Sequence, residues 1–368
     1  MSGSNTVRLD YIDIAKAIGI ITVMLSHGIG FPFDTTGYFF TASYMALFFT
    51  LSGYTYNNQR TLEESIIRRV SKIGRSYFFY SGCLFGLTIA SRIVLHNGIT
   101  RDYVLTALGG ILYSTNSLYF PRTVEPNIDF FLVQNAPLWY LTCFVAAGVL
   151  FDVFHNIVKN CRCTGLLGII LLGTFVTYLL AYIPIRLPWG IDTAFAGMTF
   201  MAFGYWIRQK NIIQKLQKWY YILFILIIYI GLCILNPGIA MSVREYGNYG
   251  VLSVIAFIMI GCLGSIIYIA IAKAISRIPA ISKPLCTVGR NTLPILAFHV
   301  FIFLVYDTIM ERVLSKIGFS LDSSILYWPI NIMKLIITVV ICIVGSLFWN
   351  KNIRIKREGK AKHGTETV

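Results

Sequence analysis

Long apolar segments recur along the whole chain, and this pattern constrains the fold more than any other feature. Each is about as long as an α-helix must be to cross ~30 Å of hydrocarbon. The segments fall at residues 11–31, 38–56, 77–95, 137–155, 165–183, 193–207, 219–235, 249–272, 292–311 and 325–349. Hydrophobic residues make up 56% of the chain and charged residues only 13%, against roughly a quarter in soluble proteins. The sequence therefore predicts an all-α integral membrane protein, a polytopic bundle of about ten transmembrane helices, and it excludes soluble enzymes and disordered scaffolds.

The positions of the basic residues predict the topology of this bundle. If the chain starts inside, the cytoplasmic gaps and both termini hold 22 of the 31 Lys and Arg residues, and the opposite gaps hold seven. Lys16 and Lys334 fall within predicted helices. Loops rich in Lys and Arg stay in the cytoplasm. We therefore interpret the net charge of +15 as a topology signal and not as nucleic-acid binding, and we expect both termini in the cytoplasm.

The chain lacks any linker rich in Pro, Gly or Ser, and this indicates one transmembrane domain at residues 1–350 and a basic cytoplasmic tail at residues 351–368. We expect the first apolar segment to be a retained helix and not a signal peptide, because no small-residue cleavage site follows it. The eight cysteines are scattered, mostly inside apolar segments, so we expect neither a disulfide framework nor a metal site.

The longest predicted external connection, residues 96–136, mixes aromatic and charged side chains. Long connections are often functional, and aromatic faces suit sugar rings. An interfacial segment anchored by tyrosines is the alternative interpretation. The residues concerned are Tyr103, Tyr113, Tyr119, Phe120, Arg122, Glu125 and Asp129.

The first predicted helix carries ionisable residues in a pattern that indicates function. Such a side chain costs roughly 2.5 to 3.5 kcal/mol to insert into a membrane, so its default interpretation is functional. Lys16 and His27 are three helical turns apart, which places them on one face and about 16 Å apart along the axis. Asp13 precedes Lys16 by one turn and can hold its ammonium group.

A cation near the inner edge of the membrane and an imidazole deeper in it suit a substrate with an anionic head and a long arm. A phosphopantetheine thioester has that shape. Two alternatives remain open. Lys16 could extend to the inner interface as an ordinary membrane lysine, and His27 could be a histidine hydrogen-bonded between helices.

A basic stretch follows the second apolar segment. Its members recur at three- and four-residue spacing, so on a helix they would form a cluster that can bind phosphates through charge-assisted hydrogen bonds. Ordinary positive charge beside anionic lipid is the alternative. Within the preceding segment, Ser52 and Gly53 are small enough to permit close helix contact. The basic residues are Arg68, Arg69, Lys72 and Arg75.

Taken together, these motifs resemble the membrane-bound acyltransferase family 3, and the version here is most similar to its fucose 4-O-acetylase-like branch. The opening pattern is a basic residue at 16, ten residues, and His27. The resemblance covers roughly residues 8–349. The supporting matches are the opening Arg8, Tyr11 and Asp13, the segments 48–54 and 69–75, Pro137 to Leu141, Trp189 to Asp192 with Gly204, and Gly289 to Pro294 leading to His299.

The resemblance implies transfer of an acyl group, usually acetyl, from cytoplasmic acyl-CoA to a hydroxyl of a polysaccharide or lipid-linked sugar outside the bacterial cytoplasmic membrane. His27 matches the catalytic histidine of the family, Lys16 its basic partner, and Arg69 with Lys72 its paired arginines. Lys stands at positions 16 and 72 where the family more often has Arg, and a lysine binds a phosphate as a point charge without the bidentate geometry of Arg.

Three questions stay open at this point. His27 could act as a general base or carry the acyl group as an acyl-imidazole. His299 could line the same cavity or pack as a structural residue. A transporter or flippase for a lipid-linked sugar is the alternative function, although the repeated halves or broken helices typical of such proteins are not evident.

Overall fold

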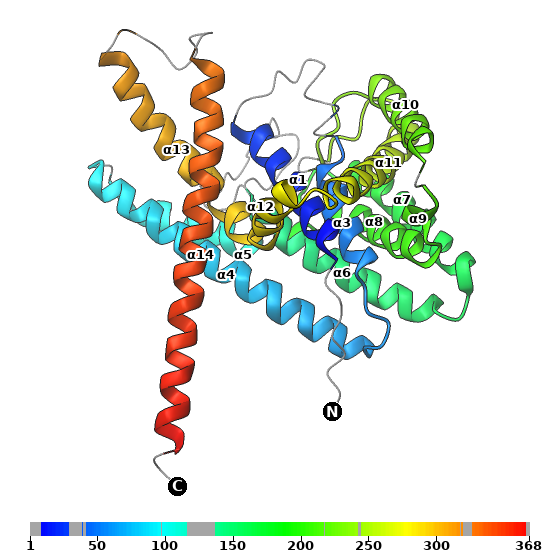
Figure 1. Cartoon of the computed structure of the whole chain (residues 1–368), viewed down its shortest axis with the longest axis horizontal. Helices are drawn as coiled ribbons and strands as arrows, with labels where there is room; N and C mark the ends of the chain where they lie inside the picture. Colours follow the sequence, from blue (N-terminus) through cyan, green and yellow to red (C-terminus); the bar gives the residue numbers. More distant parts are fainter. Residues whose placement is uncertain are drawn as a thin grey trace.

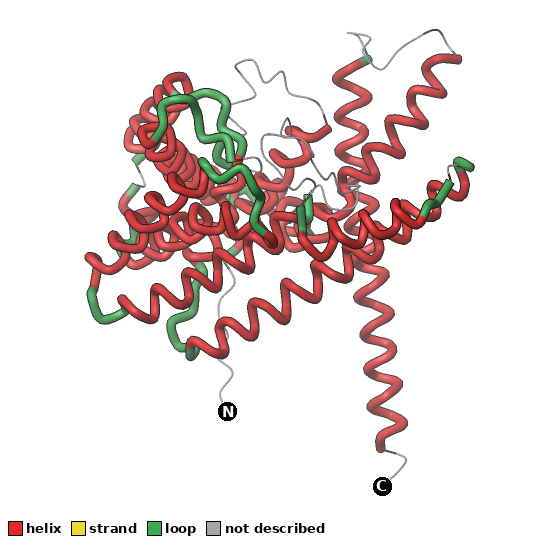
Figure 2. Tube along the Cα trace, turned by 180° about the vertical axis from the view of Figure 1, so that it is seen from behind, coloured by secondary structure: helices red, strands yellow, loops and turns green. Residues whose placement is uncertain are grey.

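The computed structural model describes residues 9–28, 39, 42–96, 98–115, 137–216, 218–241, 244–316, 318 and 326–365. These residues form a helical bundle, and within them the only β-pairing is an isolated bridge between Ala240 and Glu245 (Figures 1 and 2). The first half of the chain forms α1 (Asp10–Gly28), α3 (Tyr44–Tyr54), α4 (Leu62–Val94), α5 (Arg101–Tyr113), α6 (Trp139–Val158) and α7 (Arg162–Ala181). The second half forms η1 (Pro188–Gly190), α8 (Ile191–Gln209), α9 (Ile212–Lys215), α10 (Trp219–Leu235), α11 (Val251–Ile275), α12 (Pro279–Arg290), α13 (Thr292–Lys316) and α14 (Tyr327–Thr365).

Every apolar segment that the sequence predicts contains one of these helices. Seven helical segments in the described part of the chain are long and apolar enough to cross a membrane, in α1, α4, α6, α7, α11, α13 and α14. The apolar helix α10 has 17 residues and is shorter. The protein is thus consistent with a multi-pass membrane protein, and the total of ten crossings and the cytoplasmic termini stay predictions.

Small residues let the central helices approach closely. In α3, the Cα of Gly53 lies against the backbone of Met201 in α8, and Gly204 of α8 lies in turn against the backbone of Thr50. A side chain at either glycine would collide with that backbone. The close helix contact predicted from Ser52 and Gly53 is confirmed at Gly53, and it fixes α3 and α8 as the centre of the bundle.

Two helices extend further than the apolar segments indicate. α4 begins at Leu62, in the predicted cytoplasmic gap, because Thr61 and Glu64 form a reciprocal capping box at its start. α14 continues past residue 350, where the basic tail was predicted to begin, and projects from the bundle as far as Thr365 (Figure 1). The predicted long connection also contains a helix, α5, and residues 119–129 lie outside the described residues.

Candidate functional site

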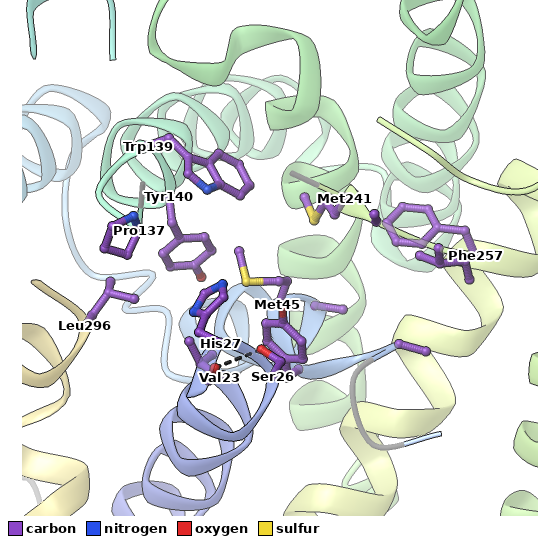
Figure 3. Close-up of a pocket in the computed structure, with 15 residues that line it drawn as sticks. Val23, Ser26, His27, Met45, Pro137, Trp139, Tyr140, Met241, Phe257 and Leu296 are labelled. Atoms are coloured by element: carbon purple, nitrogen blue, oxygen red, sulfur yellow. Dashed lines mark hydrogen bonds between the residues drawn. The ribbon is translucent and has the colours of Figure 1, made fainter. Parts of the chain in front are cut away.

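A cavity of about 200 Å³ lies beside the last turn of α1. Segments distant in sequence meet here, because α1, the start of α3, the start of α6 and α11 all contribute side chains (Figure 3). Most of the lining is apolar or aromatic, as is usual for pockets that bind small molecules. The residues labelled in Figure 3 are Val23, Ser26, His27, Met45, Pro137, Trp139, Tyr140, Met241, Phe257 and Leu296.

His27 and His299 form a hydrogen-bonded pair at this cavity. The Nδ1 atom of His27 lies 2.9 Å from Nε2 of His299, and the two rings stack with centroids 5.1 Å apart. His27 is exposed and lines the cavity, whereas His299 is completely buried. The sequence left open whether His299 lines the cavity or packs. The structure places it behind His27, in direct contact with the imidazole.

The backbone around His299 determines which ring nitrogens carry hydrogen. Nδ1 of His299 lies 3.0 Å from the carbonyl oxygen of Ile295 and 2.9 Å from that of Leu296, so we assign a hydrogen to it. In the neutral ring, Nε2 of His299 then accepts, and Nδ1 of His27 must donate. This leaves a lone pair on Nε2 of His27, the nitrogen that a general base or nucleophile uses.

Tyr140 contributes a second polar group to the cavity. Its side chain is 6% exposed, and its hydroxyl has no hydrogen-bond partner among the described residues. The hydroxyl end points toward the side of the cavity where His27 lies (Figure 3). By contrast, the hydroxyl of Ser26 donates to the carbonyl of Val23, 2.8 Å away. A buried hydroxyl without a partner is costly, and a ligand in the cavity can satisfy it.

The other end of α1 carries an ionic cluster. Asp13 is 2% exposed, and its carboxylate lies 3.7 Å from Nζ of Lys16 and 3.3 Å from Nε of Arg290. The predicted contact between Asp13 and Lys16 is therefore present. Gly289 of α12 packs directly on the backbone of Asp13, which brings Arg290 to this site. The side chains of Lys16 and Arg290 remain 37% and 47% exposed.

The basic residues of α4 separate into two groups. Arg68, Lys72 and Arg75 are exposed. Arg69 faces the bundle instead, where Nε and Nη2 donate to the two oxygens of buried Asp152, each over 3.1 Å. The structure thus places three of the four predicted phosphate-binding side chains together on the surface, and it occupies the fourth in an ion pair between α4 and α6.

Sequence reasoning missed several of these groups. Asp152 is an ionisable residue inside a predicted membrane helix and, by that signal, could have been selected as a partner for an arginine. Tyr140 and Arg290 lie inside motifs that the sequence analysis quoted, but nothing in the sequence pairs them with His27 or Asp13. Their roles depend on contacts between helices far apart in the chain.

Comparison with known proteins agrees with the motifs. No curated protein and no solved structure matches this chain. A family model described as an acyltransferase domain matches residues 9–347. That range includes the histidine pair, its cavity and both ionic clusters. Because the match spans nearly all of the 368 residues, the chain belongs to acyltransferase family 3.

Proposed function

We propose that this membrane acyltransferase moves an acetyl group from cytoplasmic acetyl-CoA to a hydroxyl of an extracytoplasmic polysaccharide or lipid-linked sugar, as in the fucose 4-O-acetylase-like branch. The observation that carries the proposal is the tautomer of His27. Its Nε2 lone pair is available in a cavity, and its Nδ1–H is held by a fully buried histidine.

The histidine pair suits acyl transfer. As the acceptor oxygen attacks the thioester carbonyl, its proton passes to Nε2 of His27, the C–O bond forms and the C–S bond breaks. The proton then passes to the departing thiolate of CoA. The imidazolium formed on the way keeps its Nδ1–H on His299. The acyl-imidazole route uses the same nitrogen, so both mechanisms remain compatible with this tautomer.

The hydroxyl of Tyr140 suits the carbonyl oxygen of the thioester. This oxygen becomes negative in the transition state, and a donor held in a water-poor site stabilises such charge strongly. Tyr140 has the two properties that this role needs, a buried hydroxyl without a partner and a place in the same cavity as His27.

The exposed cations suit the phosphates of CoA. Lys16 lies about 16 Å from His27 along α1, a distance that the flexible arm of CoA can cover. Arg68, Lys72 and Arg75 supply further positive charge from α4. We assign Arg69 a different role, because its bidentate pair with Asp152 leaves it fixed against α6. It holds α4 in register and does not bind a phosphate.

The test uses inside-out membrane vesicles that contain this protein and the surface glycan of the expressing cell. Acetyl-CoA labelled in the acetyl group is added outside, where the cytoplasmic face is exposed. We expect label on the enclosed glycan as an alkali-labile ester, and none in vesicles without the protein. Movement of the glycan across the membrane without any ester would instead support the transporter.

A further inference from the structure

A second and larger cavity, of about 560 Å³, lies back to back with the His27 cavity. The loop between α10 and α11 forms the shared wall. Ile239, Ala240 and Met241 line the His27 cavity, whereas Gly238 and Arg244 to Gly247 line the second one. Two backbone hydrogen bonds between Ala240 and Glu245, of 2.8 and 3.1 Å, close this loop on itself. The predicted topology puts the loop on the outer side of the membrane.

One turn of α11 completes the wall. Val254 lines the second cavity and Phe257 lines the His27 cavity. Tyr246 lines the second cavity and stacks on Phe257, with ring centroids 4.7 Å apart. A molecule in the second cavity is therefore separated from the His27 cavity by little more than the Tyr246–Phe257 pair and the loop backbone.

A buried ionic cluster holds this cavity in shape. Asp192 lies between two guanidinium groups, 3.2 Å from Nε of Arg244 and 3.7 Å from Nε of Arg186. Nη1 of Arg244 also donates to the carbonyl of Leu180 at the end of α7. On the other side of the loop, the Asn236 side chain donates to the carbonyls of Tyr246 and Ser253. These contacts fix the loop between α7, α8 and α11.

The lining suits a neutral, hydroxyl-rich ligand. Tyr178, Tyr182 and Tyr246 supply aromatic surface, and Glu245 and Asn248 supply exposed polar groups. The hydroxyl of Tyr246 is buried and has no hydrogen-bond partner within the described part of the chain. The charge is balanced, because Asp192 and Glu245 offset the two arginines. An anion such as a phosphate gains no net attraction here, whereas a sugar gains both stacking and hydrogen bonds.

We propose that the cavity lined by Tyr246 and Asn248 binds a non-reacting sugar residue of the acceptor and thereby presents the neighbouring residue to His27. This inference rests on the proposed function. It adds that the acceptor is an oligomer recognised over at least two sugar residues, since each cavity takes one part of it. Binding energy from a remote part of a substrate favours reaction at the reacting centre.

The test compares acceptors of graded length. Oligosaccharides from the surface polysaccharide of the expressing cell are size-fractionated from one to four residues, de-esterified, and acetylated with labelled acetyl-CoA by the purified full-length protein. Tyr246→Phe removes only the hydroxyl, and Asn248→Ala removes only the polar side chain. Tyr249→Ala is the matched control, because Tyr249 is 66% exposed on the same loop and does not line the cavity.

We expect each cavity variant to raise the KM for acceptors of two or more residues about 3- to 10-fold, the effect of one lost hydrogen bond. The KM for acetyl-CoA and the rate with a single sugar residue stay unchanged, and Tyr249→Ala behaves like wild type. An equal KM in all variants at every length overturns the proposal. Competition by inorganic pyrophosphate also overturns it, because that result identifies a phosphate site.

The test also works if the wild-type protein transfers nothing, which would contradict the proposed function itself. Labelled oligosaccharides are then measured by equilibrium dialysis against the same variants. Weaker binding to Tyr246→Phe and Asn248→Ala than to Tyr249→Ala supports a sugar site independently of catalysis. Equal binding by all three overturns it.

Discussion

The two ends of α1 carry functional groups in opposite surroundings. At the end with His27, neutral groups are held by fixed hydrogen bonds, and the partner His299 is completely buried. At the end with Lys16, charged groups surround one buried carboxylate and stay more than a third exposed. The difference shows how one helix can serve two tasks. Proton transfer needs a fixed tautomer, whereas binding a flexible polyphosphate needs accessible charge.

The largest effect is expected at His27. His27→Gln keeps a hydrogen-bonding side chain but has no nitrogen that can take a proton near neutral pH, so transfer to the glycan should fall by about 10²- to 10⁴-fold. Affinity for acetyl-CoA should stay near that of wild type, because the phosphates bind elsewhere. The measurement is ester formation and acetyl-CoA binding at matched membrane expression. Wild-type transfer by His27→Gln would show that the histidine is structural.

The next effect concerns stability and compares neighbouring arginines of α4. Arg69→Met leaves buried Asp152 without its ion-pair partner, which should lower the free energy of unfolding by about 3 to 5 kcal/mol. Arg68→Met, on the exposed face, should change it by less than about 0.5 kcal/mol. Thermal unfolding in detergent measures both. Equal unfolding temperatures would contradict the structural role of Arg69 and return it to the phosphate site.

A smaller loss is expected at His299. His299→Phe keeps an aromatic ring in the buried site beside Phe303 but removes the acceptor for Nδ1–H of His27. The rate at saturation should fall about 10- to 100-fold, as for other residues that orient a functional histidine. The KM for acetyl-CoA should not change. If the variant keeps the wild-type rate and pH profile, His299 only packs and the tautomer of His27 is set in another way.

The smallest effect is expected at the exposed end of α1. Lys16→Ala should raise the KM for acetyl-CoA about 3- to 10-fold, less than a buried charged hydrogen bond would give, because solvent screens this site. The increase should shrink as salt is added. Lys16→Arg should keep wild-type affinity, since a guanidinium offers more donors to a phosphate. An unchanged KM for Lys16→Ala would remove Lys16 from the donor site.

Much of the site could be selected from the sequence, but its pairings could not. His27, Lys16 and Asp13 lie on one helix, so their spacing alone predicts that they share a face and that Asp13 contacts Lys16. The contacts His27–His299 and Arg69–Asp152 join residues 272 and 83 positions apart. Asp152 was visible as an ionisable residue in an apolar segment, but the sequence did not indicate which arginine it meets.

The sequence by itself determined that this chain is a helical membrane protein and where its helices lie. The physical reason is local, because backbone groups in hydrocarbon must form hydrogen bonds within their own segment, and apolar length records that requirement directly. The tertiary structure decided which side of each helix faces its neighbours. Membrane helices are apolar on the lipid side as well as the protein side, so hydropathy does not reveal rotation or tilt. Only the packed bundle brings His299 behind His27, Arg290 to Asp13 and the α10–α11 loop between two cavities.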